Sequence, residues 1–284
     1  MPELPEVETI RRGLDEYIRG KKIRAVKVFS EKNFIGNSED ILGAKVLEIR
    51  RFGKALVIDF DNGRSVICHL RMTGQLIWRG AQAFAGGHPN DNFIAELPNK
   101  QTRVEIEFEG GKLFFNDQRK FGFMKVVPTE EVLEDKFIAS LAPEPWQMTG
   151  EELFARLQRH KNAPVKAVIL DQKVISGLGN IYADEALYFA KIHPARKAGT
   201  VSCAEAETLI EGARTVMERS LKSGGSTMAT YVKADGTKGN YLDLFAKVFG
   251  RDGEKCERCG AEIVKIRVAG RGTHICPCCQ KEGR

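Results

Sequence analysis

The sequence contains no apolar run long enough to cross a membrane. Its first twenty residues carry acidic side chains where a secretory signal needs an apolar core. It also contains no internal repeat and no low-complexity tract. The 284 residues, of which 29% are charged and 42% hydrophobic, are typical of a globular chain with two or three domains. We therefore expect a cytoplasmic protein that does not have a membrane as its partner.

The seven cysteines do not have the distribution of a disulfide framework, because five of them lie within the last 29 residues. Two Cys-x2-Cys pairs separated by sixteen residues have the spacing of a zinc ribbon closed by four thiolates. We predict one structural Zn²⁺ ion with the ligands Cys256, Cys259, Cys276 and Cys279. Cys278 is the spare thiol, since Cys279 keeps the two-residue gap. Cys68 and Cys203 stand alone and are interpreted as packing residues.

The charge balance is mildly basic, with a formal net charge of +6 and a pI of about 8.9. This excess is compatible with a nucleic-acid partner but does not prove one. Between the two cysteine pairs, Lys265, Arg267 and Arg271 are opposed by Glu262 alone. The stretch "AGRGT" places Arg271 between glycines at a predicted hairpin tip, where its guanidinium could reach a phosphate. A solvated surface arginine is the alternative.

Strand-like segments dominate the chain up to about residue 127, and "DNGRS" and "EGGK" are typical of hairpin turns between them. A polar, glycine-containing segment at 79–101 is interpreted as a long loop. Helical signals follow a connector. The fold class is therefore α+β. We predict a β-sandwich domain with a leading helix at 1–127, a linker at 128–148, a helical domain at 149–250 and the cysteine module at 251–284.

Within the helical part, "SGLGN" separates two predicted helices, and Asn180 is the expected N-cap of the second. Free N–H groups at a helix start, together with an amide side chain, make a potential phosphate site. An ordinary corner between two helices explains the same pattern and remains open.

The first residues, "MPELPEVE", raise a separate question. A helix over "PEVETIRRGLDEYIRG" accounts for Pro5 near its start and for Glu6 and Glu8 near the positive end of its dipole. It does not account for Pro2 or Glu3.

Taken together, "MPELPEVE", "HLRMTG", "NDQRKFG", "GLGNIYADEALY" and the terminal four-cysteine module resemble the formamidopyrimidine-DNA glycosylase family of bacterial repair enzymes. The resemblance follows the same order through nearly the whole chain. It implies a helix-two-turn-helix domain, a zinc finger, and a bifunctional DNA glycosylase and AP lyase acting on 8-oxoguanine and formamidopyrimidines. Leu4 favours this branch over its sister, endonuclease VIII, which generally has Gly there.

The resemblance also implies the catalytic residues. After removal of Met1, Pro2 presents a secondary α-amine, and such a terminal amine is about one-tenth uncharged at pH 7, far more than a lysine. Its attack on a sugar C1′ would give an iminium ion that permits β,δ-elimination. Glu3 would serve as the acid that helps open the sugar ring, and Glu6 would support the same site. Lys54 is assigned to β-elimination and Arg271 to δ-elimination, although a lone lysine on a strand usually faces solvent.

DNA contacts follow from the same motifs. A damaged base must be flipped out of the duplex, and a void-filling trio would occupy the hole: Met72, Arg119 and Phe121. Without the resemblance, Met72 and Phe121 would be taken for core residues. Further predicted contacts are His69, Gln101, Lys161 and Asn180, and a lesion-recognition loop at about 224–242 would contribute Ser226 and Thr230. Gln101 and Ala229 depart from residues common in the family.

We expect damaged double-stranded DNA as the partner, a monomer as the functional state, and a bacterial, nucleoid-associated location. Two alternatives remain at this point. One is an endonuclease VIII-like enzyme for oxidised pyrimidines, and the other is a zinc-containing DNA-binding homologue without catalytic activity.

Overall fold

The computed structural model describes residues 1–88, 90–223 and 245–282. The predicted recognition loop at 224–242, with Ser226 and Thr230, lies outside the described residues. The contacts divide the described chain into two compact units, which are treated separately below: Met1–Ala139 with Ser223, and Ser140–Lys222 with residues 245–282. Across the described ranges, no helix combines the length and the apolar character needed to span a membrane.

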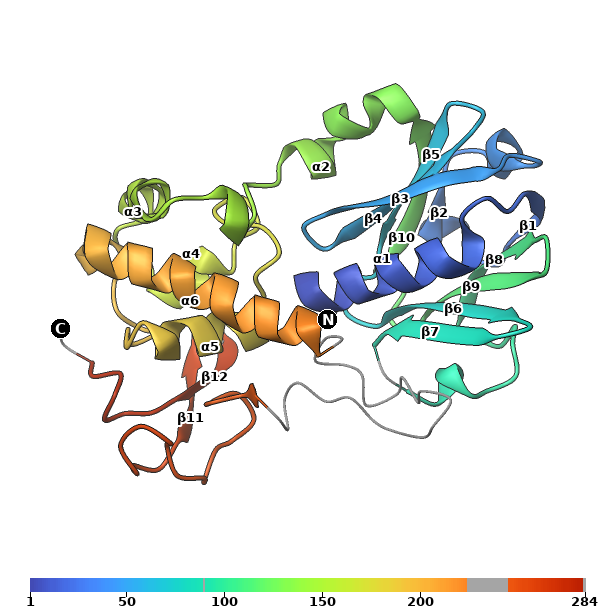
Figure 1. Ribbon diagram of the computed structural model, residues 1–284. Coiled ribbons are helices and arrows are strands. Elements are labelled where there is room, and N and C mark those ends of the chain that lie inside the picture. The colour runs from blue at the N-terminus through green and yellow to red at the C-terminus, as the bar shows by residue number, and fades with distance from the viewer. Residues whose placement is uncertain (89, 224–244, 283–284) are drawn as a thin grey trace. The chain divides into compact units, whose positions relative to one another are not determined.

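The first unit is a β-sandwich with a leading helix (Figure 1). Its helices are α1 (Leu4–Ile18) and the short α2 (Lys136–Ala139). Its strands are β1 (Ile23–Val28), β2 (Phe34–Ile35), β3 (Val46–Phe52), β4 (Ala55–Phe60), β5 (Arg64–His69), β6 (Gly74–Gly80), β7 (Ala83–Gly87), β8 (Thr102–Phe108), β9 (Gly111–Asp117) and β10 (Phe123–Pro128). They form two five-stranded sheets in the orders β1-β8-β9-β6-β7 and β2-β10-β5-β4-β3, with antiparallel pairing except between β2 and β10.

One hydrophobic core joins both sheets to α1. Ile58 and Val66 come from one sheet, Leu76 and Ile106 from the other, and Leu14 from the helix, and all five are at most 2% exposed. Alternating apolar residues of the strands face this layer, as expected for two sheets packed face to face.

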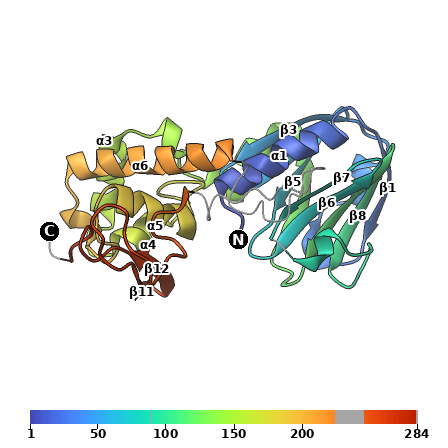
Figure 2. The same ribbon diagram turned by 60° about the horizontal axis from the view of Figure 1, so that its bottom comes forward.

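Helix α1 runs along the side of the sandwich where the edge strands of the two sheets, β3 and β7, are found (Figures 1 and 2). It thereby covers two edges that would otherwise expose unpaired backbone groups. Gly13 permits this approach, because a Cβ atom at this position would lie 2.2 Å from the ring of Phe84 on β7. The packing of α1 fixes the place of the chain's first residues.

The interpretation of 79–101 as an uninterrupted loop is wrong. Residues 83–87 form strand β7, which pairs antiparallel with β6 from Gln75↔Gly87 to Arg79↔Ala83. The remainder is held by a network of amide side chains, in which the Asn92 Nδ2 group donates to Gln75 at 3.0 Å and to Gln101 at 2.8 Å. Residues 83–87 therefore extend the sheet, and side-chain hydrogen bonds tie Asn92 to residues near both ends of the segment.

The helices of the second unit are α3 (Gly150–Arg159), α4 (Val165–Ile169), α5 (Asn180–Phe189) and α6 (Cys203–Lys222). Thr149 caps α3, as the Thr-x-x-Glu pattern of residues 149–152 indicates, with its hydroxyl accepting from the Glu152 N–H group and the Glu152 carboxylate accepting from the Thr149 N–H group. Helix α4 is shorter than the pattern of residues 163–175 suggests, since the chain turns after Leu170.

A hairpin of β11 (Val264–Val268) and β12 (Arg271–Ile275) carries the cysteine module and packs against α5 (Figure 2). Its two-residue turn places Ala269 and Gly270 at φ values of 47° and 77°, the left-handed geometry of tight hairpins. The predicted α+β class, with sandwich, helical region and cysteine hairpin, is confirmed. The predicted domain boundaries stay a prediction.

Candidate active site and nucleic-acid interface

The first residues of the chain are fixed where α1 begins. Glu3 is the N-cap residue, and its N–H group donates to Oε2 of Glu6 at 2.8 Å. Pro2 is buried, and Glu3 and Glu6 are each only 3% exposed. The helix starts at Leu4, so Pro5 occupies its first turn, where a missing N–H group leaves no intrahelical hydrogen bond unmade. Two carboxylates are therefore held out of solvent beside the amino terminus.

The terminal amine is electrostatically coupled to three nearby groups. Burial is the main cause that lowers the pKa of the Met1 α-amine. The charges of Glu3 and Glu6 act in the opposite direction, and the charge of Lys54 lowers the pKa further. The terminal amine thus interacts with two buried carboxylates and a buried ammonium group of the first unit.

Lys54 lies in the tight turn between β3 and β4 and is only 4% exposed. The alternative of a solvent-facing strand lysine is therefore wrong. Gly53, at a φ of 54°, makes the turn possible. The next residue, Ala55, pairs with His69 across β4 and β5, so Lys54 is brought next to that histidine.

His69 is 5% exposed, stacks on the ring of Phe123 and meets the ring of Phe137 edge to face. Its Nδ1 atom accepts from the Arg71 N–H group at 2.9 Å, which assigns the ring proton to Nε2. Burial, followed by the charges of Arg71 and Lys54, lowers the pKa of His69 to about 3. The imidazole is therefore neutral at physiological pH and offers one N–H donor.

The predicted void-filling residues lie on two exposed loops. Met72 is 37% and Phe121 51% exposed, so the alternative that they are core residues is wrong. The Arg119 guanidinium lies 4.9 Å from the centroid of the Phe121 ring. The loops meet where the Arg119 N–H group donates to the Thr73 hydroxyl at 3.0 Å. The structure thus brings two loops with an arginine, a thioether and an aromatic ring together.

Gln101, a predicted DNA contact, forms hydrogen bonds within the protein through both its backbone and its side chain. Its carbonyl accepts from the Asp117 N–H group at 2.9 Å, and its side-chain oxygen accepts from Asn92. It therefore links the 79–101 segment to the strand that precedes the Arg119 loop.

In the second unit, the expectation that Asn180 caps α5 is wrong. Gly179, with extended backbone, is the N-cap, and Asn180 is the first helical residue. The Asn180 Nδ2 group instead donates to the carbonyl of Gly272 at 3.1 Å. Arg271, the neighbour of Gly272, is exposed at the start of β12, and Lys161 is exposed after α3. The structure thus brings Asn180 and Arg271 together and leaves both basic side chains accessible.

Sequence reasoning missed a buried ion pair behind the Arg271 hairpin. Lys166 Nζ lies 2.6 Å from Oδ1 of Asp184, and both side chains are at most 1% exposed. The same ammonium donates to the carbonyl of Gly272 at 3.1 Å and to the Thr273 hydroxyl at 2.8 Å. Asp184 in turn accepts from the His274 N–H group at 2.9 Å. These contacts tie α4 and α5 to β12.

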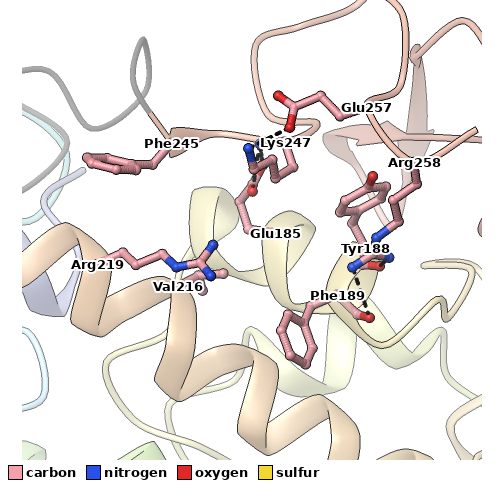
Figure 3. Close-up of a pocket in the computed structure, with 9 residues that line it drawn as sticks. All are labelled: Glu185, Tyr188, Phe189, Val216, Arg219, Phe245, Lys247, Glu257 and Arg258. Carbon is pink, nitrogen blue, oxygen red and sulfur yellow. Dashed lines mark hydrogen bonds and ion pairs between the residues drawn. The ribbon is translucent and has the colours of Figure 1, made fainter. Parts of the chain in front are cut away.

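Glu185, the next residue of α5, holds the segment that leads into the cysteine module. Its carboxylate accepts from the N–H groups of Lys247, Val248 and Phe249 at 2.8–3.0 Å. It lines a cavity of about 290 Å³ with Tyr188, Phe189, Val216, Arg219, Phe245, Lys247, Glu257 and Arg258 (Figure 3). Among the described residues, none of the predicted site residues lines this cavity. In the sequence, the burial of Asp184 and Glu185 is indicated only by their position as an acidic pair within an otherwise apolar helix.

The four predicted zinc ligands converge at the base of the hairpin. The Sγ atoms of Cys256, Cys259, Cys276 and Cys279 all lie within 4.8 Å of one another, and three of the six separations are 3.4–3.9 Å. Zn–S bonds of about 2.3 Å in a tetrahedron require sulfur separations of about 3.8 Å, so the four thiols fit one zinc ion. Cys278 is exposed and does not belong to the cluster. Cys68 is buried as expected, whereas Cys203 is exposed and is not a packing residue.

Three family models match the chain in sequence. The formamidopyrimidine-DNA glycosylase N-terminal domain matches residues 1–124, the H2TH domain of the same enzymes matches 141–232, and a zinc finger found in these enzymes and in an isoleucyl-tRNA synthetase matches 253–281. The chain belongs to the formamidopyrimidine-DNA glycosylase family. It is a DNA glycosylase and AP lyase of base-excision repair, and the four cysteines are the ligand set of one structural zinc ion.

Curated relatives in the family cover the full length. The formamidopyrimidine-DNA glycosylase of Desulfitobacterium hafniense is 39% identical over 99% of this chain and all of the relative, and that of Pediococcus pentosaceus is 40% identical over 99% of both. A solved structure of the Lactococcus lactis enzyme bound to DNA with an AP site has a TM-score of 0.85 at 31% identity, covering 99% of this chain. DNA is accordingly the partner of this chain.

Proposed function

We propose that the chain excises oxidised purines, chiefly 8-oxoguanine and formamidopyrimidines, from double-stranded DNA through covalent catalysis by Pro2. The observation that carries the proposal is the electrostatic coupling of the terminal amine to three buried side chains, Glu3, Glu6 and Lys54. Solved Lactococcus lactis relatives were crystallised with DNA containing Fapy-dG, which supports this substrate class.

The chemistry starts once Met1 has been removed and the Pro2 nitrogen has become the terminal amine. Its lone pair attacks C1′ of the damaged nucleotide, and the bond from C1′ to the base breaks as the base leaves with a proton. Glu3 protonates the sugar ring oxygen as the ring opens. The Glu6 carboxylate holds Glu3 in place by accepting from the Glu3 backbone N–H group. The product is an iminium ion, which carries a positive charge without an added proton.

Strand cleavage follows from the acidity of the C2′ hydrogen next to the iminium ion. Loss of this proton expels the 3′ phosphate by β-elimination, and a second elimination expels the 5′ phosphate. We assign Lys54 to the first step, because it lies beside the amine. Arg271, exposed on the finger hairpin, is assigned to the phosphate that leaves in the second step.

The remaining predicted residues bind the duplex in this proposal. Met72, Arg119 and Phe121 fill the hole left by the flipped nucleotide, with Arg119 bonding to the orphaned cytosine. His69 donates to a phosphate as a neutral imidazole, and Gln101, Lys161 and Asn180 make further backbone contacts. Ser226 and Thr230 are assigned to lesion recognition. We also propose that the protein acts as a monomer and is located in the bacterial cytoplasm.

Borohydride trapping tests the covalent step. Wild type should form a DNA adduct with an 8-oxoguanine:cytosine duplex, and P2G should form none, whereas K54M should trap while cleaving more slowly. Mass spectrometry of the same preparation should show that Met1 is absent. An undiminished adduct with P2G would contradict the mechanism. Absence of any adduct with wild type would favour the DNA-binding homologue without catalytic activity.

Substrate preference is tested with paired duplexes that contain 8-oxoguanine or thymine glycol. A Lactococcus lactis relative has been crystallised with DNA containing an oxidised pyrimidine, so some activity on the second duplex is expected. Faster excision of thymine glycol than of 8-oxoguanine would favour the endonuclease VIII-like alternative. Sedimentation at micromolar concentration, with and without DNA, tests the monomer.

A further inference from the structure

One buried carboxylate connects the two loops that carry Met72, Arg119 and Phe121. Asp117, at the end of β9, is fully buried. Its Oδ1 atom accepts from the Thr73 hydroxyl and from the Arg119 N–H group at 3.2 Å, and its Oδ2 atom accepts from the Gly122 N–H group at 2.7 Å. Thr73 directly follows Met72, and Arg119 and Gly122 lie on either side of Phe121. The carboxylate therefore spans both loops.

The two loops need such a restraint because each contains a residue in an unfavourable backbone conformation. Arg71, which precedes Met72, has a φ of 51°, and Lys120, which precedes Phe121, has a φ of 56°. Neither is a glycine, so each left-handed conformation costs about 1–2 kcal/mol and persists only where the surroundings enforce it. The Asp117 hydrogen bonds supply that enforcement on both sides.

Every group that faces the Asp117 side chain in these contacts is a donor, and a carboxylate is the side chain that accepts at both oxygens. The Thr73 hydroxyl gives its proton to Asp117 and accepts from the Arg119 N–H group, which closes the network. An asparagine at this position would place an NH₂ group against either the Gly122 or the Arg119 N–H group. It would therefore lose an acceptor and introduce opposed donors.

We propose that Asp117 is a positioning residue for filling the DNA void, acting through Thr73, Arg119 and Gly122. The inference rests on the proposed role of Met72, Arg119 and Phe121. It predicts that Asp117 matters where a base has left a duplex and its partner strand must be held. It has no part in the covalent chemistry at Pro2.

The test compares duplex and single-stranded substrates for D117N. Excision from an 8-oxoguanine:cytosine duplex should fall about tenfold or more in kcat/KM, the factor expected for losing a hydrogen bond to a charged acceptor. Borohydride trapping on a single-stranded oligonucleotide with an AP site should stay within about twofold of wild type, since no void exists there. Preference for cytosine over adenine opposite 8-oxoguanine should decrease, because Arg119 would be less well placed.

Variants of Thr73 give a second route to the same answer. T73V removes the hydroxyl and should reproduce the defect on the duplex, whereas T73S keeps it and should restore wild-type rates. A 2-aminopurine opposite a tetrahydrofuran AP analogue reports loop insertion directly, and its fluorescence change should be reduced in D117N and T73V but normal in T73S.

Asp59 provides a matched control, because this buried carboxylate of β4 also accepts several hydrogen bonds, from Arg50 and Ser65, in the other sheet of the same unit. A defect in D59N equal to that of D117N would overturn the proposal, as would equal losses on duplex and single-stranded DNA or wild-type behaviour of D117N and T73V. Wild type that traps no DNA at all would instead overturn the proposed function.

Discussion

Replacing Lys166 by methionine tests whether the buried contact between α4, α5 and the finger hairpin stabilises the second unit. The ammonium contacts Asp184 Oδ1 at 2.6 Å and two groups of β12, the Gly272 carbonyl and the Thr273 hydroxyl. Methionine has a similar length and is apolar, so K166M removes the charge without opening a large cavity. It leaves Asp184 buried and charged, with the His274 N–H group still donating to its carboxylate.

The expected loss follows from the burial of both partners. Removal of one partner from a buried ion pair typically costs about 3–5 kcal/mol, because the other charge stays desolvated without compensation. A urea m-value of about 1–3 kcal/mol/M converts this into a fall of roughly 1–5 M in the unfolding midpoint. Zinc release into a chromogenic chelator during a urea titration reports this module, since its four thiolate ligands lie beside the hairpin.

Two variants make the measurement specific. E254Q removes the exposed pair between Arg251 and Glu254, in which the glutamate is 58% exposed, and should cost less than about 1 kcal/mol. K166M/D184N should be more stable than K166M alone, because an amide at 184 removes the buried charge and can still accept from His274. A K166M midpoint no lower than that of E254Q would refute the reasoning, as would a double variant less stable than K166M.

Three further results are expected. Burial lowers the folded-state pKa of His69 to about 3. Below pH 6.5 the unfolded chain therefore binds a proton at His69 that the folded protein does not, and the free energy of unfolding falls as the pH decreases. About 2 kcal/mol of stability should be lost at pH 5 in urea unfolding, and an equal loss in H69Q would contradict this. G13A should destabilise by about 1–3 kcal/mol in thermal unfolding, because its methyl group would meet Phe84; unchanged stability would refute the close packing. C279S should lose zinc by elemental analysis and bind DNA weakly, whereas C278S should keep both; zinc loss in C278S would reverse the ligand assignment.

The sequence was sufficient for features that depend on local chemistry. The leading helix, the Thr149 cap and the choice of Cys279 over Cys278 follow from spacing and capping rules, and the structure agrees. Strand β7 was not predicted because "AFAGG" lacks an alternation of apolar and polar residues. It becomes a strand through its pairing with β6. Such non-local pairing is decided by the partner strand, which a single segment does not reveal.

The burial of charged residues could not be predicted for a related reason. Lysine and aspartate are expected at the surface unless paired, and the partner is a matter of tertiary structure. Lys54 is buried because a tight turn directs it inward beside the terminal amine, and Lys166 because a hairpin more than a hundred residues later supplies its acceptors. The prediction that Asn180 caps α5 failed for the same reason. Its side chain donates to the carbonyl of Gly272 in that hairpin, and Gly179 is the N-cap residue.

Three buried carboxylates show how this fold places its proposed DNA-contacting segments. Asp117 holds the Met72 and Arg119 loops, Asp184 holds the hairpin of Arg271, and Glu185 holds the residues that enter the finger. Each accepts hydrogen bonds from backbone N–H groups, so each fixes main chain and leaves the exposed side chains of these segments available to DNA. The sequence marks Asp184 and Glu185 only by their place in an apolar helix, whereas the structure distinguishes all three acids by the hydrogen-bond donors that face them. Substitution of any of these acids should therefore weaken DNA contacts, although the acids themselves do not contact DNA. The losses in DNA binding at the three sites can be compared directly.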